Sequence, residues 1–358
     1  MTDRLLAAVI FCGDRSRLGR AVLLAALGQR HPVKAVVVPT AARWTRFEAR
    51  LTRGERAPIQ RSARSRLDPL RRFLAALRPR KAERDPLDVA WGLPGPSEIP
   101  ALCRTHRVEM LRVDDANDPS VAARLSSMGA EVFLAGAYPQ VFRRPVLDAR
   151  GLAVNIHPSL LPRFRGANPI YWTLAMGAAE TGVTAHVMVP QVDAGPILAQ
   201  RAVPIAAEDE YYSLYGKLVR TVPEVVAMAL DAVARGDRGF RQEEDKATAF
   251  HEPRPTDRRL NWSRDTARAL HNRVRAGEAF AFVRGEAVSV ERARLEEAET
   301  QDGSRPANGT IVVLAPDGPG VIVAGGRIYL TRVIFRGLPL EREAFVNAAG
   351  LRPGLLLT

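Results

Sequence analysis

The chain has 358 residues, of which 46% are hydrophobic and 25% charged, a composition typical of a globular protein large enough for two cores. No apolar run reaches the roughly 18 residues of a membrane-spanning helix, and the first 20 residues lack the pattern of a secretory signal. Two cysteines are too few for a disulfide framework or a cysteine-rich metal site, so we expect a reducing, cytoplasmic location.

The formal net charge of +13 is concentrated in one segment. Between Arg43 and Arg84 there are fourteen Lys or Arg residues against four Asp or Glu residues. Such a block attracts polyanions, such as nucleic acid or anionic lipid, or simply keeps a surface solvated. Trp44 and Phe47 lie among these arginines. They either stack on unpaired bases or, as we favour, pack within the segment's own helix.

Strands and helices alternate along the first part of the chain, which predicts an α/β fold with a parallel sheet. The apolar segment 4–12, a helical stretch and a second strand at 33–40 open this pattern. Residues 41–98 interrupt it and are predicted to form a basic, partly helical insertion. Further strands are expected at 108–115, 130–138, 151–159, 181–195 and 196–205, and helices at 98–107, 118–129 (with Asp118 as N-cap), 168–177 and 211–236.

The last third of the chain has a different pattern. Residues 237–262 are polar and irregular and predict a linker, which a helix at 263–277 follows. Short strands separated by turn residues are then expected at 279–286, 287–297, 309–316, 320–335 and 351–358. We therefore expect a Rossmann-like, mostly parallel sheet domain over 1–205, a helix and linker over 206–255, and a small OB-like β-barrel domain over 256–358.

Two polar side chains lie at the end of the strand predicted at 151–159. Open parallel sheets bind ligands at the carboxyl ends of their strands. Because side chains alternate along a strand, Asn155 and His157 point to one face and can converge on one substrate atom. Asp193 lies 38 residues beyond Asn155, in a glycine-containing loop between two predicted strands. A loop on a neighbouring strand can bring Asp193 beside His157.

Asn, His and Asp in one cleft suit acyl transfer to an amine without a covalent intermediate. An amide N–H or an imidazolium stabilises the developing oxyanion, and an Asp beside a His raises the imidazole pKa and relays a proton. The sequence has no nucleophile elbow of the G-x-S-x-G type, no HExxH and no Cys/His cluster, so neither an acyl-enzyme nor a metal is expected. Each residue alone is more often structural: a strand-end cap, a satisfied core histidine or a turn aspartate.

The segment from Asn155 to Gln200 resembles the formyltransferases that use 10-formyltetrahydrofolate. The resemblance implies that Asn155, His157 and Asp193 are catalytic and that 10-formyltetrahydrofolate is the formyl donor, with no metal. It also implies that the pterin lies against backbone groups of two loops, one containing Gln140, Val141 and Phe142 and the other Gln191 and Val192. The motif elements that carry the resemblance are Asn155 and His157, then Ser159, Leu160, Leu161 and Pro162, then Gly166 and Pro169, then Thr181, Gly182 and Thr184, and last Asp193 and Gly195.

The formyl acceptor is less sharply indicated. Residues 257–358 resemble the C-terminal domain of family members that act on methionyl-tRNA, which argues against a purine-pathway enzyme, and the basic insertion favours tRNA and a role in protein biosynthesis. Asn168 and the stretch 275–283 depart from the tRNA-type pattern. These departures favour an amino sugar on a nucleotide, whose diphosphate arginines would bind, or a hydroxyornithine-like amine. We take a tRNA acceptor as the first expectation and the small amine as the alternative.

Two other classes of function remain open from the sequence. A formyltetrahydrofolate hydrolase would use the same three residues on water. It would carry an N-terminal regulatory domain, for which the early first strand leaves no room. A non-catalytic protein could use residues 66–80 as a basic amphipathic helix on RNA or a membrane. Retention of all three catalytic residue types argues against this last class.

Overall fold

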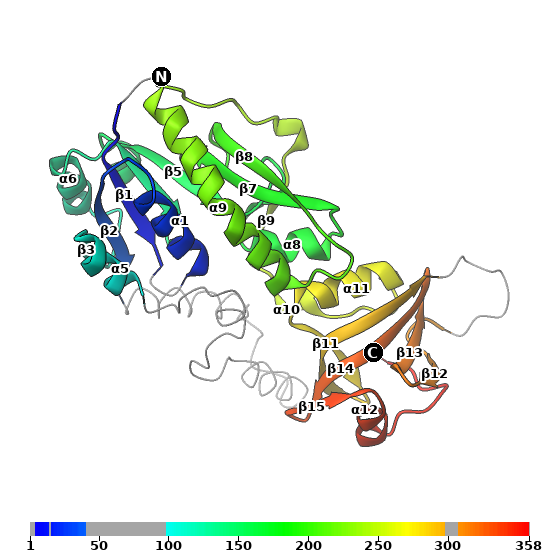
Figure 1. The fold of residues 1–358 in the computed structure, drawn as a ribbon. Helices are drawn as coiled ribbons and strands as arrows, with labels where there is room; N and C mark the ends of the chain where they lie inside the picture. The colour runs from blue at the N-terminus through cyan, green and yellow to red at the C-terminus, as the bar shows by residue number, and fades with distance from the viewer. Residues whose placement is uncertain (1–3, 14–15, 41–97, 298–306, 358) are drawn as a thin grey trace, which may run out of the picture.

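The computed structural model describes residues 4–13, 16–40, 98–297 and 307–357 (Figure 1). The basic insertion predicted at 41–98 lies outside the described residues except for Glu98. The same holds for Trp44, Phe47 and the amphipathic stretch 66–80. In the described part of the chain, no helix is long and apolar enough to cross a membrane.

A seven-stranded sheet forms the first part of the molecule, in the order β3-β2-β1-β4-β5-β7-β8. Its first five strands are parallel, β7 runs antiparallel to β5, and β8 runs antiparallel to β7. This confirms the expected α/β class with a mostly parallel sheet. The strands are β1 (Ala8–Cys12), β2 (Val33–Pro39), β3 (Glu109–Val113), β4 (Val132–Gly136), β5 (Leu152–His157), β7 (Glu180–Val187) and β8 (Ile197–Pro204).

Helices cover both faces of this sheet, and the alternation of strand side chains divides the core between them. Ile10, Leu134 and Ile156 pack in the cluster on the face of α1 (Arg17–Leu27), α5 (Ile99–His106) and α9 (Tyr211–Ala234). Phe11 and Phe133 point the other way, into the cluster beneath α6 (Pro119–Ser127) and α7 (Arg144–Leu147). As expected, Asp118 is the N-cap of α6, and its carboxylate accepts a hydrogen bond from the Ser120 N–H.

The segment predicted as a linker is not a free connection, because it pairs with strands of the first part of the molecule. After α9 the chain returns to the sheet, and Phe240 exchanges backbone hydrogen bonds with Ile197. It then forms a 3₁₀ turn, η1 (Glu244–Lys246), and the short strand β9 (Ala249–Phe250), which pairs with β6 (Arg165–Gly166). Polar composition suggested a solvated connection, but here the polar groups bond to the loops of the candidate site.

The second part of the molecule is a small antiparallel sheet domain, as expected. Its order is β10-β11-β14-β13-β12, and β15 pairs with β14. The apolar run 320–335 was predicted as one strand and is two, because the chain reverses at Gly325 and Gly326, both with positive φ. The predicted closing strand at 351–358 is not a continuous strand over the described residues 351–357: this tail forms one isolated bridge, from Leu356 to Thr310, and further backbone hydrogen bonds to Gly309 and Ile311. The elements are α10 (Pro255–Arg258), α11 (Ala267–Ala276), β10 (Ala279–Val283), β11 (Glu286–Glu297), β12 (Ile311–Ala315), β13 (Gly318–Val323), β14 (Gly326–Phe335), β15 (Leu338–Glu341) and α12 (Arg342–Ala349), the last of which was not predicted.

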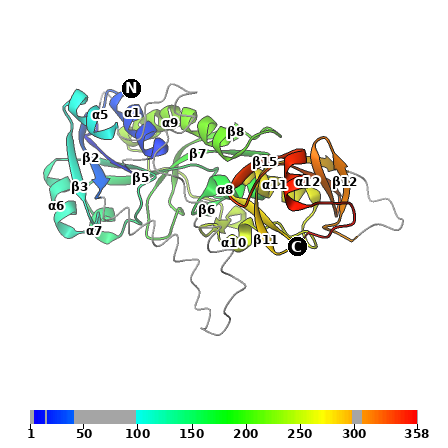
Figure 2. The same ribbon diagram turned by 90° about the horizontal axis from the view of Figure 1, so that it is seen from below.

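The two parts lie side by side and meet where α11 packs against α8 (Pro169–Ala175) (Figure 2). The Arg275 guanidinium donates to the carbonyl oxygens of Ala206 and Asp209, and the Tyr171 hydroxyl donates to the carbonyl of Asp257. The packing of α11 against α8, together with these hydrogen bonds, fixes the second domain beside α8, the helix that follows β5 and β6 in the chain. The division at residues 205 and 256 stays a prediction.

Candidate active site

Asn155 and His157 lie on the same face of β5. Val154 and Ile156, which alternate with them, are buried on the α1–α9 side, so Asn155 and His157 face the side of α6 and α7. β7 runs antiparallel to β5 and places His186 opposite Asn155 and Thr184 opposite His157. The expectation that the two β5 side chains share one face therefore holds in the structure.

Asp193 reaches the same place from the loop between β7 and β8. One carboxylate oxygen, Oδ2, lies 3.6 Å from Nδ1 of His157 and accepts the Gly166 N–H at 2.8 Å. The other, Oδ1, lies 3.4 Å from Nε2 of His186 and 3.5 Å from the Asn155 amide nitrogen. The three predicted side chains thus form one cluster, with Asp193 at its centre.

The charge of Asp193 is stabilised by its surroundings. Burial alone would raise the pKa of this carboxyl, but His157, His186 and the Gly166 N–H outweigh burial and hold the pKa well below its ordinary value. Asp193 is therefore ionised at neutral pH. Its backbone adopts a left-handed conformation with φ of +52°, which a non-glycine residue keeps only when surrounding contacts impose it.

His157 is buried, and both of its ring nitrogens face acceptors. Nε2 lies 2.9 Å from the Phe164 carbonyl, which makes it the N–H donor, and Nδ1 faces Asp193. Burial lowers the pKa of the imidazole, and the opposing effects of Asp193 and the Phe164 carbonyl offset only part of that shift. Asp193 raises this pKa, as expected from the sequence, but desolvation of the cation is the larger effect, so the net shift of the His157 pKa is downward.

His186 is a fourth polar member of the cluster that sequence reasoning missed. It is almost fully buried, and its Nε2 lies 3.2 Å from the Asn155 amide nitrogen. Its Nδ1 lies 3.0 Å from the Val187 carbonyl. The only available sequence signal was a histidine two residues after Thr184 in a predicted strand. Its position opposite Asn155 depends on the β5–β7 register, which a single sequence does not provide.

The predicted folate loops differ in their exposure. The Phe142 side chain packs in the core against Phe11, so only its backbone is left for a ligand. Gln140 bonds to Asp115 and Ala116, whereas Val141 and Val192 are large apolar side chains at least half exposed to solvent. Gln191 is also exposed, in the loop that carries Asp193. The assignment of these five residues to the folate stays a prediction.

The described residues contain no group of three or more His, Cys, Asp or Glu side chains arranged to hold a metal ion. What the cluster offers is a buried carboxylate, two imidazoles and one amide. Such a set can orient a polar carbonyl and exchange a proton with a reacting amine.

The fold and this cluster together define a group-transfer enzyme. The chain matches the formyl transferase family over residues 8–230 and the formyl transferase C-terminal domain over residues 254–349. It belongs to the formyl transferase family. This confirms the expected class, a one-carbon group transferase, and 10-formyltetrahydrofolate is the formyl donor associated with that family.

Individual relatives agree with the family assignment. The methionyl-tRNA formyltransferase of Synechococcus sp. (strain JA-3-3Ab) is 34% identical over 275 residues, which cover 74% of this chain and 84% of the relative. Two solved structures have a similar fold. A sugar N-formyltransferase from Shewanella sp. has a TM-score of 0.54 at 15% identity and covers 82% of this chain and 99% of its own. The sugar 3N-formyl transferase WlaRD has a TM-score of 0.55 at 13% identity and covers 91% and 97%.

Proposed function

We propose that this enzyme transfers the formyl group of 10-formyltetrahydrofolate to the amino group of methionyl-tRNA. The observation that carries the choice of acceptor is the 34% identity to a methionyl-tRNA formyltransferase over 84% of that relative's length. The net charge of +13 supports a polyanionic acceptor, because lysines and arginines that neutralise phosphates supply much of the affinity for RNA. A cytoplasmic location, expected from the lone cysteines, is part of this proposal.

In the proposed reaction the neutral amine attacks the formyl carbon, and the bond from that carbon to N10 of the folate breaks. The amine loses one proton and N10 gains one. Asn155 donates an amide N–H to the oxyanion that forms in between. The His157–Asp193 pair takes the proton from the amine and returns it to N10, directly or through water. A neutral resting imidazole beside an ionised carboxylate supports this role, since the imidazolium becomes favourable once the proton arrives.

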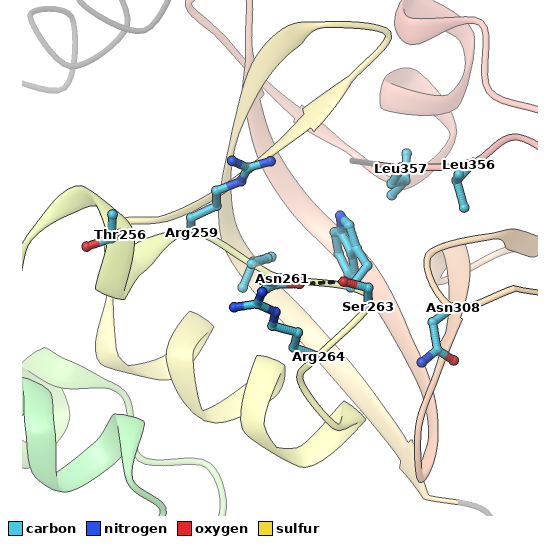
Figure 3. A pocket seen from close by; sticks show the side chains of 10 residues that line it. Thr256, Arg259, Asn261, Ser263, Arg264, Asn308, Leu356 and Leu357 are labelled. Carbon is cyan, nitrogen blue, oxygen red and sulfur yellow. Dashed lines mark hydrogen bonds between the residues drawn. The ribbon is translucent and has the colours of Figure 1, made fainter. Parts of the chain in front are cut away.

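A cavity in the second domain supports a phosphate-bearing acceptor. It has a volume of about 670 Å³ and lies between the segment before α11, the C-terminal tail and Asn308 (Figure 3). Arg259 and Arg264 line it together with Asn261, whose side-chain oxygen accepts the Ser263 hydroxyl. The described lining residues include no Asp or Glu, so the cavity is cationic. Guanidinium groups bind phosphate oxygens in this kind of setting.

The departures from the tRNA-type pattern have structural explanations that weaken the small-amine alternative. Asn168 has a left-handed backbone and caps α8, accepting the Tyr171 N–H, and its side chain also meets Tyr211 and Glu252. Arg275, in the second departing stretch, joins α11 to the first domain. Asn168 and Arg275 therefore each make contacts that stabilise the fold, and these contacts do not depend on the identity of the acceptor.

The experiment that tests this proposal is a formylation assay with 10-formyltetrahydrofolate and two parallel acceptors, methionyl initiator tRNA and a panel of nucleotide-linked amino sugars. We expect turnover on the tRNA, and a kcat/KM that falls steeply with salt concentration. Turnover on a sugar without turnover on the tRNA would overturn the proposed acceptor. Release of formate without any acceptor would instead favour the hydrolase.

A further inference from the structure

The segment that follows α9 crosses the candidate site. It is held to β8 at one end, where Phe240 bonds to Ile197, and to β6 at the other, where Arg165 N–H donates to the Thr248 carbonyl at 2.8 Å. Between these two anchors, Arg241 and Glu243 are exposed but Gln242 is buried. A single buried amide in an otherwise solvated polar stretch needs hydrogen-bond partners within the protein.

Gln242 finds four such contacts. Its side-chain nitrogen donates to the carbonyl oxygens of Asp193 at 2.8 Å and Gly195 at 2.7 Å. Its side-chain oxygen accepts from Nε and Nη2 of Arg165, at 3.1 and 2.8 Å. This arrangement fixes the orientation of the amide, because a flipped amide would point its oxygen at two carbonyls and its nitrogen at a guanidinium.

Arg165 is itself buried and is held on its outer side by Glu244, at 2.8 and 2.9 Å. The next residue along the chain, Gly166, donates its N–H to the Asp193 carboxylate. Gln242 therefore connects the backbone of Asp193 to the same short strand that binds the Asp193 side chain. β6 therefore holds the Asp193 carboxylate directly, through Gly166, and the Asp193 backbone indirectly, through Arg165 and Gln242.

We propose that Gln242 is a positioning residue for Asp193. It holds the Asp193–Gly195 backbone so that the carboxylate stays between His157 and His186. The proposal rests on the proposed catalytic role of Asp193. Gln242 has no direct contact with the other two members of the predicted trio in the described structure, so its effect on turnover passes through Asp193.

The test compares Gln242→Leu and Gln242→Glu with the unchanged enzyme in the formylation assay. The leucine removes all four contacts, and the glutamate keeps the contact to Arg165 but turns an acceptor toward the two carbonyls. We expect kcat to fall on the order of 100-fold, as for a catalytic group displaced by about 1 Å, with the KM values little changed. The acid limb of the kcat–pH profile should move, because the Asp193–His157 pair titrates as a unit. Glu243→Leu, on the exposed neighbour, is the matched control and should behave as wild type.

A double-mutant comparison separates positioning from mere stabilisation. In an Asp193→Asn background, Gln242→Leu should cost little further activity, because its route to the chemistry is already lost. Equal losses in both backgrounds would overturn the inference. So would a lowered melting temperature with wild-type kcat and pH profile at low temperature. If Asp193→Asn itself kept full activity, the proposed function of Asp193 would fail instead, which keeps the two failures distinct.

Discussion

The Asn155 amide nitrogen and Nε2 of His186 lie 3.2 Å apart, across the pairing of β5 with β7. Nδ1 of His186 lies against the Val187 carbonyl and is therefore assigned as the N–H donor, so that in the neutral ring Nε2 is an acceptor. One hydrogen of the Asn155 amide then points to His186. The second hydrogen remains for the formyl oxygen, because the distance from the amide nitrogen to the Asp193 carboxylate is 3.5 Å, which allows at most a weak hydrogen bond.

Replacing Asn155 by alanine should remove the proposed oxyanion donor. Loss of one such donor costs about 100- to 1,000-fold in kcat in other acyl transfers. We expect a loss of this order in the formylation assay, with a smaller change in KM for the donor. The melting temperature serves as the control for folding. An Asn155→Ala enzyme that folds normally and keeps its turnover would contradict the assignment.

Replacing His186 should act through Asn155. His186→Leu removes the acceptor that orients the amide, whereas His186→Gln retains an oxygen that can accept the same hydrogen bond. We expect kcat to fall about tenfold or more in the leucine variant and less in the glutamine variant, a range consistent with outer residues that orient catalytic groups. Equal values of kcat in the two variants would show that the contact between His186 and the Asn155 amide does not contribute to catalysis. Two-dimensional ¹H–¹⁵N spectra of the histidine side chains check the assigned tautomer independently.

The stability of the protein should fall with pH below the ordinary pKa of histidine. Burial lowers the pKa of His157 in the folded state, so the unfolded chain binds more protons below about pH 6.5, and acid favours unfolding. The stabilisation from the neutral imidazole is present above that pH and is lost below it. His31 and His271 have pKa values lowered by burial as well and act in the same direction. The depressed pKa of Asp193 adds a further loss below about pH 3.9.

This pH effect can be isolated with His157→Gln. Each extra proton bound by the unfolded state contributes up to about 1.4 kcal/mol per pH unit. Urea denaturation at a series of pH values between 7 and 4.5 should therefore give a flatter dependence of the unfolding free energy for the variant than for wild type. Parallel curves would mean that the pKa of His157 is not depressed in the folded protein.

Sequence patterns accounted for the strands of the seven-stranded sheet and for the clustering of Asn155, His157 and Asp193. Alternation put Asn155 and His157 on one face, and the motif around Asp193 brought in the third residue. They did not predict that His186 belongs to the cluster, because its position opposite Asn155 depends on the register between β5 and β7. Nor did they predict Gln242, which reaches Asp193 from 49 residues away through a stretch whose polarity resembles a linker. Polar residues that serve a site from outside its motif are identified only by the packing.

The remaining errors have local causes. Ala324 and Gly325, which lie between β13 and β14, have no polar side chain, so hydropathy could not separate the two strands, and only the paired glycines marked the turn. For His157, sequence reasoning anticipated that the charge of Asp193 raises the imidazole pKa, but not that burial lowers it by more, because only the structure supplies the depth of burial.

Adding a methyl group at Gly195 should disrupt the Asp193 loop. A Cβ there would lie 1.8 Å from the Val187 carbonyl oxygen, so the backbone must move. We expect Gly195→Ala to lower the unfolding free energy by about 2–3 kcal/mol, and to reduce kcat as well. Gly28→Ala is the matched control, because its Cβ would make ordinary contacts in a right-handed conformation and should not destabilise. Denaturant melts compare the two, and an undisturbed Gly195→Ala protein would rule out the close approach.

Arginines of the second-domain cavity should contribute to acceptor binding and not to chemistry. Arg264 lines the cavity, and the lining residues include no carboxylate that would compete with a phosphate; the neighbouring Asp265 is paired with Arg273. We expect Arg264→Ala to raise KM for methionyl-tRNA, leave kcat and the donor KM unchanged, and reduce the slope of log kcat/KM against log salt by about one. Arg235→Ala, at the exposed end of α9, is the control for a simple loss of positive charge. The same salt slope in both variants would place the phosphate contacts elsewhere, because the cavity arginine would then behave like any surface charge.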